Sequence, residues 1–241
     1  MSKRVFLAGA TGAIGRRLCM LLVRDGWHVV GTTRAPDKAQ ALGHIGVEPV
    51  VVDVFDAGRL TEAVVQARPD AVIHQLTDLP PNLDPSQMAE ARIRNARLRE
   101  IGTRNLVGAT VAAGAKRLIA QSVAFAYAPG PLPYREDAPL HVDAPADIGI
   151  STRGVASLEE QVLAAPLDGI VLRYGRLYGP GTGSETPPAG GPVHVDAAAN
   201  ATRRALTHGA KGIYNIAEDD GTVDSRKAAE ALGWDARFRM S

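Results

Sequence analysis

Hydrophobic residues in this sequence follow two patterns that alternate along most of the chain. Short continuous apolar runs, such as VFLA at residues 5–8 and AVI at 71–73, are typical of strands buried on both faces. Between these runs, apolar residues recur every three to four positions, which is typical of amphipathic helices. The runs predict strands at residues 5–8, 28–32, 48–53, 70–76, 116–122, 169–174 and 212–217, and the spaced segments predict helices at 14–22, 36–42, 58–67, 86–113, 196–208 and 225–232.

Strands that alternate with helices predict an α/β fold with a doubly wound parallel sheet. In such a sheet, ligands bind beyond the carboxyl ends of the strands. Residues 179–192 (GPGTGSETPPAGGP) interrupt the alternation, because glycine, proline and serine dominate them and no apolar periodicity is present. We therefore expect an irregular loop in this late part of the chain.

The first predicted strand runs directly into a glycine-rich turn and then into the first predicted helix. Gly9 permits the tight turn, Gly12 permits close approach to a pyrophosphate, and Gly15 permits packing of the helix on the strand. The helix N-terminus adds free N–H groups and the positive end of its dipole, and both favour phosphate. We therefore interpret this turn as a dinucleotide-binding loop rather than a purely structural one. Its expected cofactor-binding residues are Gly9, Thr11, Gly12, Ala13, Ile14 and Gly15.

The end of the second predicted strand bears on which dinucleotide is bound. An NAD site usually places an acidic residue about 20 residues past the glycines, where it accepts hydrogen bonds from the ribose 2′-hydroxyl. Here the strand ends in Thr33 and Arg34, and a guanidinium with a threonine hydroxyl fits a 2′-phosphate. We therefore predict NADP(H) as the preferred cofactor, with NAD(H) as the second option. The alternative is that Arg34 is simply a solvated residue ahead of a helix.

Residues after the third and fourth predicted strands complete the expected cofactor set. Asp53 is placed to bond the adenine, and a helix-capping or surface role is the alternative. The other members follow the same two strands, at the sheet edge where ligands bind: Val54, Gln75, Leu76 and Thr77.

Composition restricts the class of protein further. Hydrophobic residues make up 45% of the chain and charged residues 22%, which is typical of a soluble globular protein. The net charge of +1 favours neither nucleic acid nor a membrane surface as a partner. Cys19 has no second cysteine with which to form a disulfide, no apolar stretch reaches membrane-spanning length, and the histidines lack metal-ligand spacing. We therefore predict a cytoplasmic protein with a small-molecule substrate, no metal, and no nucleic-acid or membrane partner.

Several motifs occur in the order found in one enzyme family. They are GATGAIG at 9–15, Asp53-Val54, VIHQL at 72–76, GTRNL at 102–106, RYGRLYGPGT at 173–182, HVDAA at 194–198, GIYNIA at 212–217 and LGW at 232–234. On these motifs the sequence resembles the extended short-chain dehydrogenase/reductase family, the NAD-dependent epimerase/dehydratase group. The resemblance implies a Rossmann NAD(P)-binding domain at residues 1–175 and a small C-terminal substrate-binding region at residues 176–241, partly packed on it.

The C-terminal region is shorter than the family pattern, both between the GPG and HVD motifs and after GIYNIA. Those segments form much of the substrate pocket in the family. The resemblance therefore implies a pocket that is small, open, or completed by another subunit.

Catalysis in this family uses a serine together with a tyrosine placed four residues before a lysine, and the tyrosine is the general acid/base. None of the tyrosines here, at positions 127, 134, 174, 178 and 214, precedes a lysine at that spacing. Aligning Glu160-Gln161 with the family's helix places Thr152 and Ala156 where the tyrosine and lysine are expected. The usual proton-transfer dyad is therefore absent from the sequence.

The resemblance still nominates catalytic candidates, namely Ser122, Tyr127 and Thr152. Ser122 matches the family's serine position to within one residue, and a backbone-capping role is its alternative. Tyr127 lacks a lysine partner and should keep the pKa of about 10 of a free tyrosine, so packing is its favoured role. The substrate-binding candidates are Gln121, Arg173, Tyr174 and Tyr178.

Two of the remaining charged features have a structural alternative that competes with a functional one. Arg173 either contacts a substrate anion or pairs with an acidic residue. His194 and Asp196 could form a charge relay, but in the family this segment is structural, and Asp196 is suited to begin a helix. We favour the structural interpretation of that pair.

Two functional hypotheses follow. The first is an NAD(P)-dependent oxidoreductase of the epimerase/dehydratase group, which acts on a small carbonyl or alcohol beside Ser122. The second is a non-catalytic NADP(H)-binding sensor or partner-binding module, which the missing dyad favours. Family members often dimerise through the helix predicted at 86–113, so a homodimer is an expected assembly. The arginines of that helix are expected on a solvated face: Arg92, Arg94, Arg97, Arg99 and Arg104.

Overall fold

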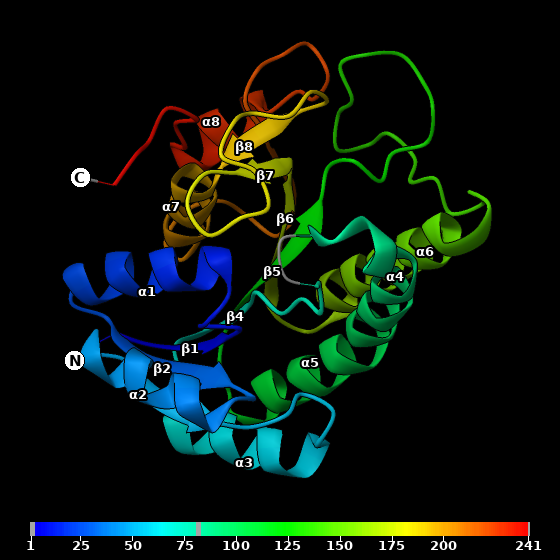
Figure 1. The fold of residues 1–241 in the computed structure, drawn as a ribbon. Helices are drawn as coiled ribbons and strands as arrows, with labels where there is room; N and C mark the ends of the chain where they lie inside the picture. Colours follow the sequence, from blue (N-terminus) through cyan, green and yellow to red (C-terminus); the bar gives the residue numbers. More distant parts are fainter. Residues whose placement is uncertain (1–2, 81–82, 241) are drawn as a thin grey trace.

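A parallel sheet of seven strands crosses the centre of the molecule in the computed structural model, which describes residues 3–80 and 83–240 (Figure 1). The strand order is β3-β2-β1-β4-β5-β6-β9, and every neighbouring pair is parallel. The chain order reverses between β1 and β4, and doubly wound sheets bind ligands at such a switch point. The strands are β1 (Arg4–Ala8), β2 (His28–Thr33), β3 (Glu48–Val51), β4 (Ala71–His74), β5 (Arg117–Val123), β6 (Asp168–Tyr174) and β9 (Gly212–Ile216).

Helices cover both faces of the sheet, as Figure 1 shows. On one face, α1 packs against α7, and their apolar side chains share a core with those of α2 and α8. On the other face, α3, α5 and α6 share a second core, and α4 packs beside α6. The predicted doubly wound α/β class is confirmed. The helices are α1 (Ala13–Arg24), α2 (Pro36–His44), α3 (Ala57–Ala67), α4 (Met88–Arg97), α5 (Thr103–Ala112), α6 (Ala146–Ala164), α7 (Val195–Ala205) and α8 (Arg226–Leu232).

The long helix predicted at residues 86–113 has internal irregularities. A short 3₁₀ turn, η2 (Pro85–Gln87), precedes α4, and a π-helical turn, η3 (Leu98–Gly102), joins α4 to α5. Turns of the π type inside helices frequently accompany functional sites, because they re-aim the side chains on either side.

Helix α6 is the largest element that the hydrophobic pattern did not predict. Eight of its 19 residues are glycine, alanine, serine or threonine, and its contact with α4 explains why. A Cβ atom at Gly154 would lie 2.7 Å from the Cα atom of Ala96 in α4, so only a glycine permits this approach. Packing between small residues leaves no strong apolar stripe in the sequence.

Residues 176–240 contribute to both the sheet and its surroundings. β9 extends the main sheet beside β6, and α7 covers part of one face. A second, two-stranded parallel ribbon pairs β7 (Arg176–Tyr178) with β8 (Pro192–His194). The expected loop at 179–192 connects these two short strands. The domain boundary at residue 175 stays a prediction of the sequence.

Candidate functional site

The glycine loop between β1 and α1 has one open side. A Cβ atom at Gly9, whose φ is +93°, would lie 2.5 Å from the carbonyl oxygen of Gln75, and one at Gly15 would collide with the carbonyl oxygen of Gly9. A Cβ at Gly12 would meet only the Gly9 carbonyl oxygen, at 3.5 Å. Packing within the protein therefore requires glycine at the first and third positions, whereas the second borders free space. This is the arrangement that close approach of a diphosphate needs.

The start of α1 offers positive potential to that space. Gly12 is the N-cap and supplies no side-chain hydrogen bond, and the first turn carries no acidic residue. A hollow of about 410 Å³ lies against this turn, lined by Thr11, Ala13, Arg16 and Arg17 and, across from them, by Pro180 and Gly181. Free helix N–H groups and two arginines suit an anion. The loop and hollow fit the diphosphate of a dinucleotide.

Two arginines share one carboxylate near the end of β2. Arg34 Nη2 lies 3.7 Å from one Asp78 oxygen, and Arg94 Nε lies 3.5 Å from the other. The Arg34 side chain is 53% exposed, so it is free to reorient toward a ligand. Thr33 Oγ1 accepts a hydrogen bond from Ala35 N (3.1 Å) and is mostly buried. Cationic groups therefore gather where an adenosine ribose is expected.

The other cofactor candidates differ in accessibility. Asp53 follows β3 and accepts a hydrogen bond from Phe55 N (2.9 Å), while Val54 is buried against Gly102. Asp56, and not Asp53, caps α3 by accepting a hydrogen bond from Arg59 N. After β4, Leu76 is half-buried and Thr77 is exposed. Both residues lie at the sheet edge where a ligand would bind.

Gln75 lies deeper than its neighbours, together with the predicted substrate residue Tyr174. Gln75 Nε2 donates to Tyr174 Oη (3.2 Å) and to Thr202 Oγ1 (3.1 Å), while Gln75 Oε1 is buried with no hydrogen-bond partner among the described residues. Tyr174 is 1% exposed, and burial raises its pKa to about 12. Its position is that of a core residue that ties β6 to α7.

Ser122 and Arg173 belong to one buried polar network, which Glu159 of α6 organises. Ser122 Oγ donates to Glu159 Oε1 (2.6 Å), and Arg173 donates to both oxygens of the same carboxylate (2.8 and 2.6 Å). Arg173 is therefore paired with an acidic residue, as one of its two sequence interpretations expected. The network joins β5, α6 and β6 at the carboxyl edge of the sheet.

Tyr127 closes this network on its other side. Its hydroxyl donates to Asn215 Oδ1 (2.6 Å) and accepts from Arg173 Nη1 (2.9 Å). Burial raises the pKa of Tyr127, although the charge and hydrogen bond of Arg173 oppose that rise. A phenol held in this way is a poor base at neutral pH, which agrees with the favoured packing role.

Thr152 and Ala156 lie on successive turns of α6. The Thr152 hydroxyl donates to the Ile148 carbonyl oxygen of its own helix (3.0 Å), and the side chain is buried. Ala156 is half-buried, as is Gln121 at the end of β5. Neither α6 residue presents a free acid or base group.

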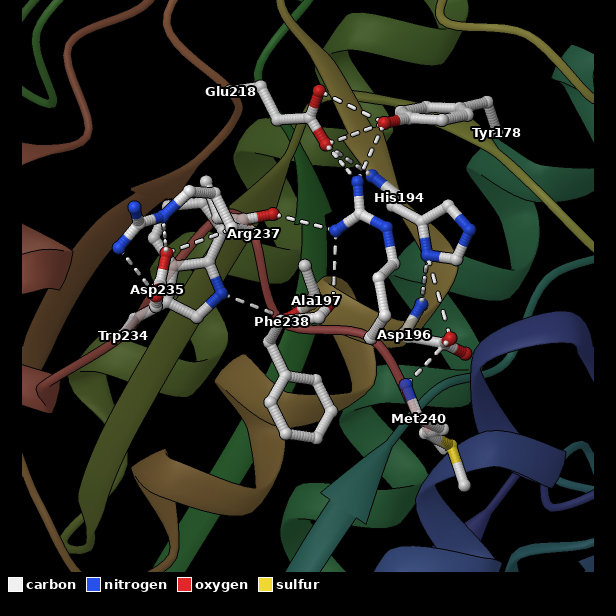
Figure 2. A network of polar contacts seen from close by, with 12 residues as sticks. Tyr178, His194, Asp196, Ala197, Glu218, Trp234, Asp235, Arg237, Phe238 and Met240 are labelled. Atoms are coloured by element: carbon white, nitrogen blue, oxygen red, sulfur yellow. Dashed lines mark hydrogen bonds and ion pairs between the residues drawn. The ribbon is translucent and has the colours of Figure 1, made fainter.

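Tyr178 and His194 are held by the last residues of the described chain (Figure 2). Tyr178 Oη donates to Glu218 (2.8 Å) and accepts from Arg239 Nη2 (2.9 Å), and the Tyr178 ring meets the His194 ring edge-on. His194 Nδ1 accepts from Asp196 N (3.2 Å), so His194 is the N-cap of α7. The structural interpretation of this pair is confirmed, but the cap is His194 and not Asp196.

Two residues with polar contacts at the site escaped the sequence interpretation. Glu159 lies in the helix that the pattern missed, so no signal identified it. Arg99 was expected on a solvated helix face, and that expectation was wrong: burial lowers the pKa of its guanidinium to about 10, and Nη1 donates to Ser151 Oγ (3.2 Å). The π-helical turn turns this side chain inward.

The fold, the switch point and the glycine loop together define a nucleotide-binding α/β protein with a ligand site at the carboxyl edge of its sheet. A family model described as NAD(P)H-binding matches residues 9–206, and the chain belongs to that family. Solved NAD-dependent epimerases share its fold, which is the fold that the resemblance to the epimerase/dehydratase group implied. It is an NAD(P)-binding protein with a reductase-like function.

Named relatives support this assignment. The 3-diazoavenalumate denitrifying reductase of a Streptomyces species is 43% identical over 239 residues, covering 90% of this chain and 76% of the relative. UDP-glucose 4-epimerase from Thermotoga maritima has a TM-score of 0.79 at 18% identity, with 98% and 94% of the two chains covered. The Bordetella bronchiseptica enzyme WbmH, solved with NAD⁺, has a TM-score of 0.75 at 21% identity, with 97% and 92% covered. The structural likenesses carry the fold, and the Streptomyces relative carries the reductase class.

Two kinds of feature are absent from the described residues. Within residues 3–80 and 83–240, no helix has the length and apolarity needed to cross a bilayer. In the same part of the chain, no three histidine, cysteine or acidic side chains come together as a metal-binding group would require.

Proposed function

We propose that this protein is an NADP(H)-dependent reductase that delivers hydride to an aryl diazonium substrate and releases N₂. The observation that carries the proposal is that neither candidate for proton transfer, Thr152 or Tyr127, has a hydroxyl free for that role in the described part of the chain. Thr152 is bonded to its own helix, and Tyr127 is held between Arg173 and Asn215. The substrate class comes from the name of the Streptomyces relative, which describes a denitrifying reductase of a diazo compound.

The chemistry of such a substrate matches a site without an acid. A bound reduced nicotinamide supplies a hydride ion. Reduction of a carbonyl also requires a proton at the oxygen, which an acid group normally donates. When an aryl diazonium ion takes up hydride, one C–H bond forms, one C–N bond breaks, and the bonding pair leaves with N₂. The atoms and charges of the reaction therefore balance without a proton from the protein.

Different residues would bind different groups of the cofactor. The free N–H groups of α1 and the space beside Gly12 would hold the diphosphate, with Arg16 and Arg17 at its border. Arg34 and Arg94 would hold the 2′-phosphate of NADP(H) by charge-assisted hydrogen bonds. Thr77 would face the cofactor at the end of β4.

The buried network would supply a fixed wall beside the reacting carbon. The charges of Glu159 and Arg173 neutralise one another, and the Ser122 hydroxyl donates its hydrogen bond to Glu159. Side chains restrained in this way hold their positions without rearrangement when substrate arrives. In this role Ser122 positions the substrate by contact and transfers no proton.

We also propose that the chain forms a homodimer through the helical run of α4 and α5 with α6. Ile93 of α4 and Ile148 of α6 expose 50% and 49% of their surface. Their burial against a second copy would favour association. Light scattering of the purified protein would then give twice the chain mass, and Ile93→Glu would return it to one.

The reaction is tested with 4-carboxybenzenediazonium as the probe. We expect consumption of NADPH with release of one N₂ per NADPH, and deuterium from one face of [4-²H]NADPH at the carbon that bore the diazo group. The matched carbonyl, 4-carboxybenzaldehyde, should be reduced far more slowly. Faster reduction of the aldehyde, or benzoate without deuterium at that carbon, would contradict the proposal.

Two variants distinguish the enzyme-catalysed reaction from direct reduction of the probe by NADPH in solution. Gly12→Asp places a carboxylate in the open space beside the loop and should abolish the catalysed rate. Gly108→Ala, at an exposed site in α5 where an added Cβ meets no atom within 4 Å, should leave the rate unchanged.

A further inference from the structure

Arg99 occupies an unusual place for an arginine. It belongs to the π-helical turn between α4 and α5, and its Nη1 lies 3.2 Å from Ser151 Oγ and 3.3 Å from the Ser151 carbonyl oxygen in α6. Burial lowers the pKa of the guanidinium, and the charge of Glu159 opposes that fall. With a pKa of about 10, Arg99 is still charged at neutral pH.

This half-buried cation has no counter-ion of its own among the described residues. Among the described residues, no carboxylate oxygen lies within 4.0 Å of the Arg99 guanidinium, and neither Nε nor Nη2 makes a hydrogen bond to them. Glu159 is already engaged by Arg173 and Ser122. A cation that is partly withdrawn from water without a partner carries a desolvation cost, which an anionic ligand would offset.

The position of Arg99 along its helix directs it toward the ligand edge of the sheet. Thr103, one turn further on, contacts His74 at the carboxyl end of β4 (3.1 Å), and the charge of Arg99 lowers the pKa of that histidine after burial does. Helical side chains incline toward the helix N-terminus, and α4 and α6 both begin at the carboxyl edge. Arg99, Ser151 and Ala156 are each partly accessible to solvent in this region.

We propose that Arg99 and the Ser151 hydroxyl bind a carboxylate of the substrate beside Thr152 and Ala156 of α6. The inference rests on the proposed reductase function and adds the anionic group by which its substrate is held. The free Nε and Nη2 donors match the two oxygens of a carboxylate. The diphosphate of the cofactor is assigned to α1, which covers the opposite face of the sheet, so the two anions do not compete.

The test measures binding, and it requires no turnover. Benzoate and cinnamate are titrated calorimetrically into protein saturated with NADP⁺, with their methyl esters for comparison. We expect the wild-type protein to bind each carboxylate at least tenfold more tightly than its ester. Arg99→Gln should lose that discrimination while its affinity for NADPH and for the esters stays unchanged, and Arg99→Lys should retain part of it.

The thermal midpoint separates a binding role from a structural one. Because Arg99 has no ion-pair partner among the described residues, Arg99→Gln should melt at the same temperature as the wild type or higher, whereas loss of a structural arginine would lower the midpoint. Arg97→Gln is the matched control, since Arg97 lies two residues earlier on the exposed side of the same run. It should change neither binding nor melting.

Three results would overturn the inference. They are equal binding of carboxylate and ester by the wild type, full carboxylate affinity in Arg99→Gln, and an equal loss of NADPH affinity in that variant, which would assign Arg99 to the cofactor. If Arg99→Gln fails to fold, Arg99→Lys and Ser151→Ala decide the matter by the same titrations. A protein that binds carboxylates through Arg99 but reduces no diazonium ion would contradict only the proposed reaction.

Discussion

Individual charged residues at this site are distinguished by their partners. Arg173 is paired with Glu159, whereas Arg99 donates hydrogen bonds, within the described residues, to Ser151 alone. Pairing makes the first arginine part of the framework, because the carboxylate satisfies both its charge and its donors. The lack of pairing leaves the second one available to a ligand. Both residues are arginines, and the side chains around each of them determine its role.

Arg34 carries the prediction about cofactor preference. Arg34→Ala removes a cation from the expected 2′-phosphate position, so its affinity for NADPH should fall about tenfold, while its affinity for NADH should stay nearly constant. Asp78→Asn should act in the opposite direction, because it removes the carboxylate that both Arg34 and Arg94 face. Cofactor dissociation constants, from the fluorescence of the bound reduced nicotinamide, provide the measurement.

Arg24→Ala is the matched control for Arg34, because Arg24 is exposed in the last turn of α1, away from the glycine loop. It should leave both affinities unchanged. An equal loss of NADPH and NADH affinity in Arg34→Ala would show that Arg34 does not read the 2′-phosphate.

At the scale of elements, the contact between α4 and α6 positions much of the site. Both helices approach closely at Gly154 and Ala96, and their neighbouring turns carry Arg99, Ser151 and Thr152. An ion pair between Arg92 and Asp147 joins their first turns at 2.5 Å. The separation of these two helices therefore sets the space beside Ala156.

Gly154→Ala tests how tightly this contact is packed. The added Cβ would lie 2.7 Å from the Cα atom of Ala96, which is backbone and cannot rotate away. Overpacking of this kind should lower the free energy of unfolding by about 1–3 kcal/mol, as measured by urea denaturation. Carboxylate binding should weaken as well, because the helices that carry Arg99 and Ser151 are forced apart.

Gly108→Ala serves as the comparison, because it lies in α5 with no atom within 4 Å of the added Cβ. It should raise the free energy of unfolding by up to about 1 kcal/mol through helix propensity alone. If both variants proved equally stable, the α4–α6 contact would have to be looser than this structure describes.

At the scale of the whole molecule, stability depends on pH through buried groups, and His74 is the clearest of them. Burial, and then the charge of Arg99, lower its pKa from 6.5 to about 4. Between these values the unfolded chain takes up a proton on this imidazole and the folded protein does not. Stability is therefore fully present above about pH 6.5 and falls as the pH drops toward 4.

The pH dependence of unfolding measures this effect. Over that interval the free energy of unfolding should fall by about 3 kcal/mol from His74 alone. His74→Gln should flatten the decline, although its starting stability at neutral pH is lower because the contact with Thr103 is altered. His44→Gln, at an exposed site in α2, should leave the decline intact. An unchanged slope in His74→Gln would mean that another group causes it.

The sequence by itself determined the class of fold, and it predicted the cofactor loop. Continuous apolar runs that alternate with helical segments are typical of strands buried on both faces, and a glycine trio between a strand and a helix favours a dinucleotide turn. The placement of Thr152 and Ala156 at the family's proton-transfer positions stays a prediction of the sequence. These signals are local in the chain, so they can be read without knowing which segments meet.

Only the tertiary structure decided which charges are partnered. Glu159 lies far in sequence from Ser122, and the pairing of β5 with β6 places Ser122 opposite Arg173, so that both side chains reach the Glu159 carboxylate. Arg99 resembled a solvated arginine until the π-helical turn directed it toward α6. The small residues of α6 gave no apolar stripe, because close helix packing uses glycine and alanine in place of large side chains. Burial and ion pairing depend on contacts between distant segments, and no local pattern in the chain encodes them.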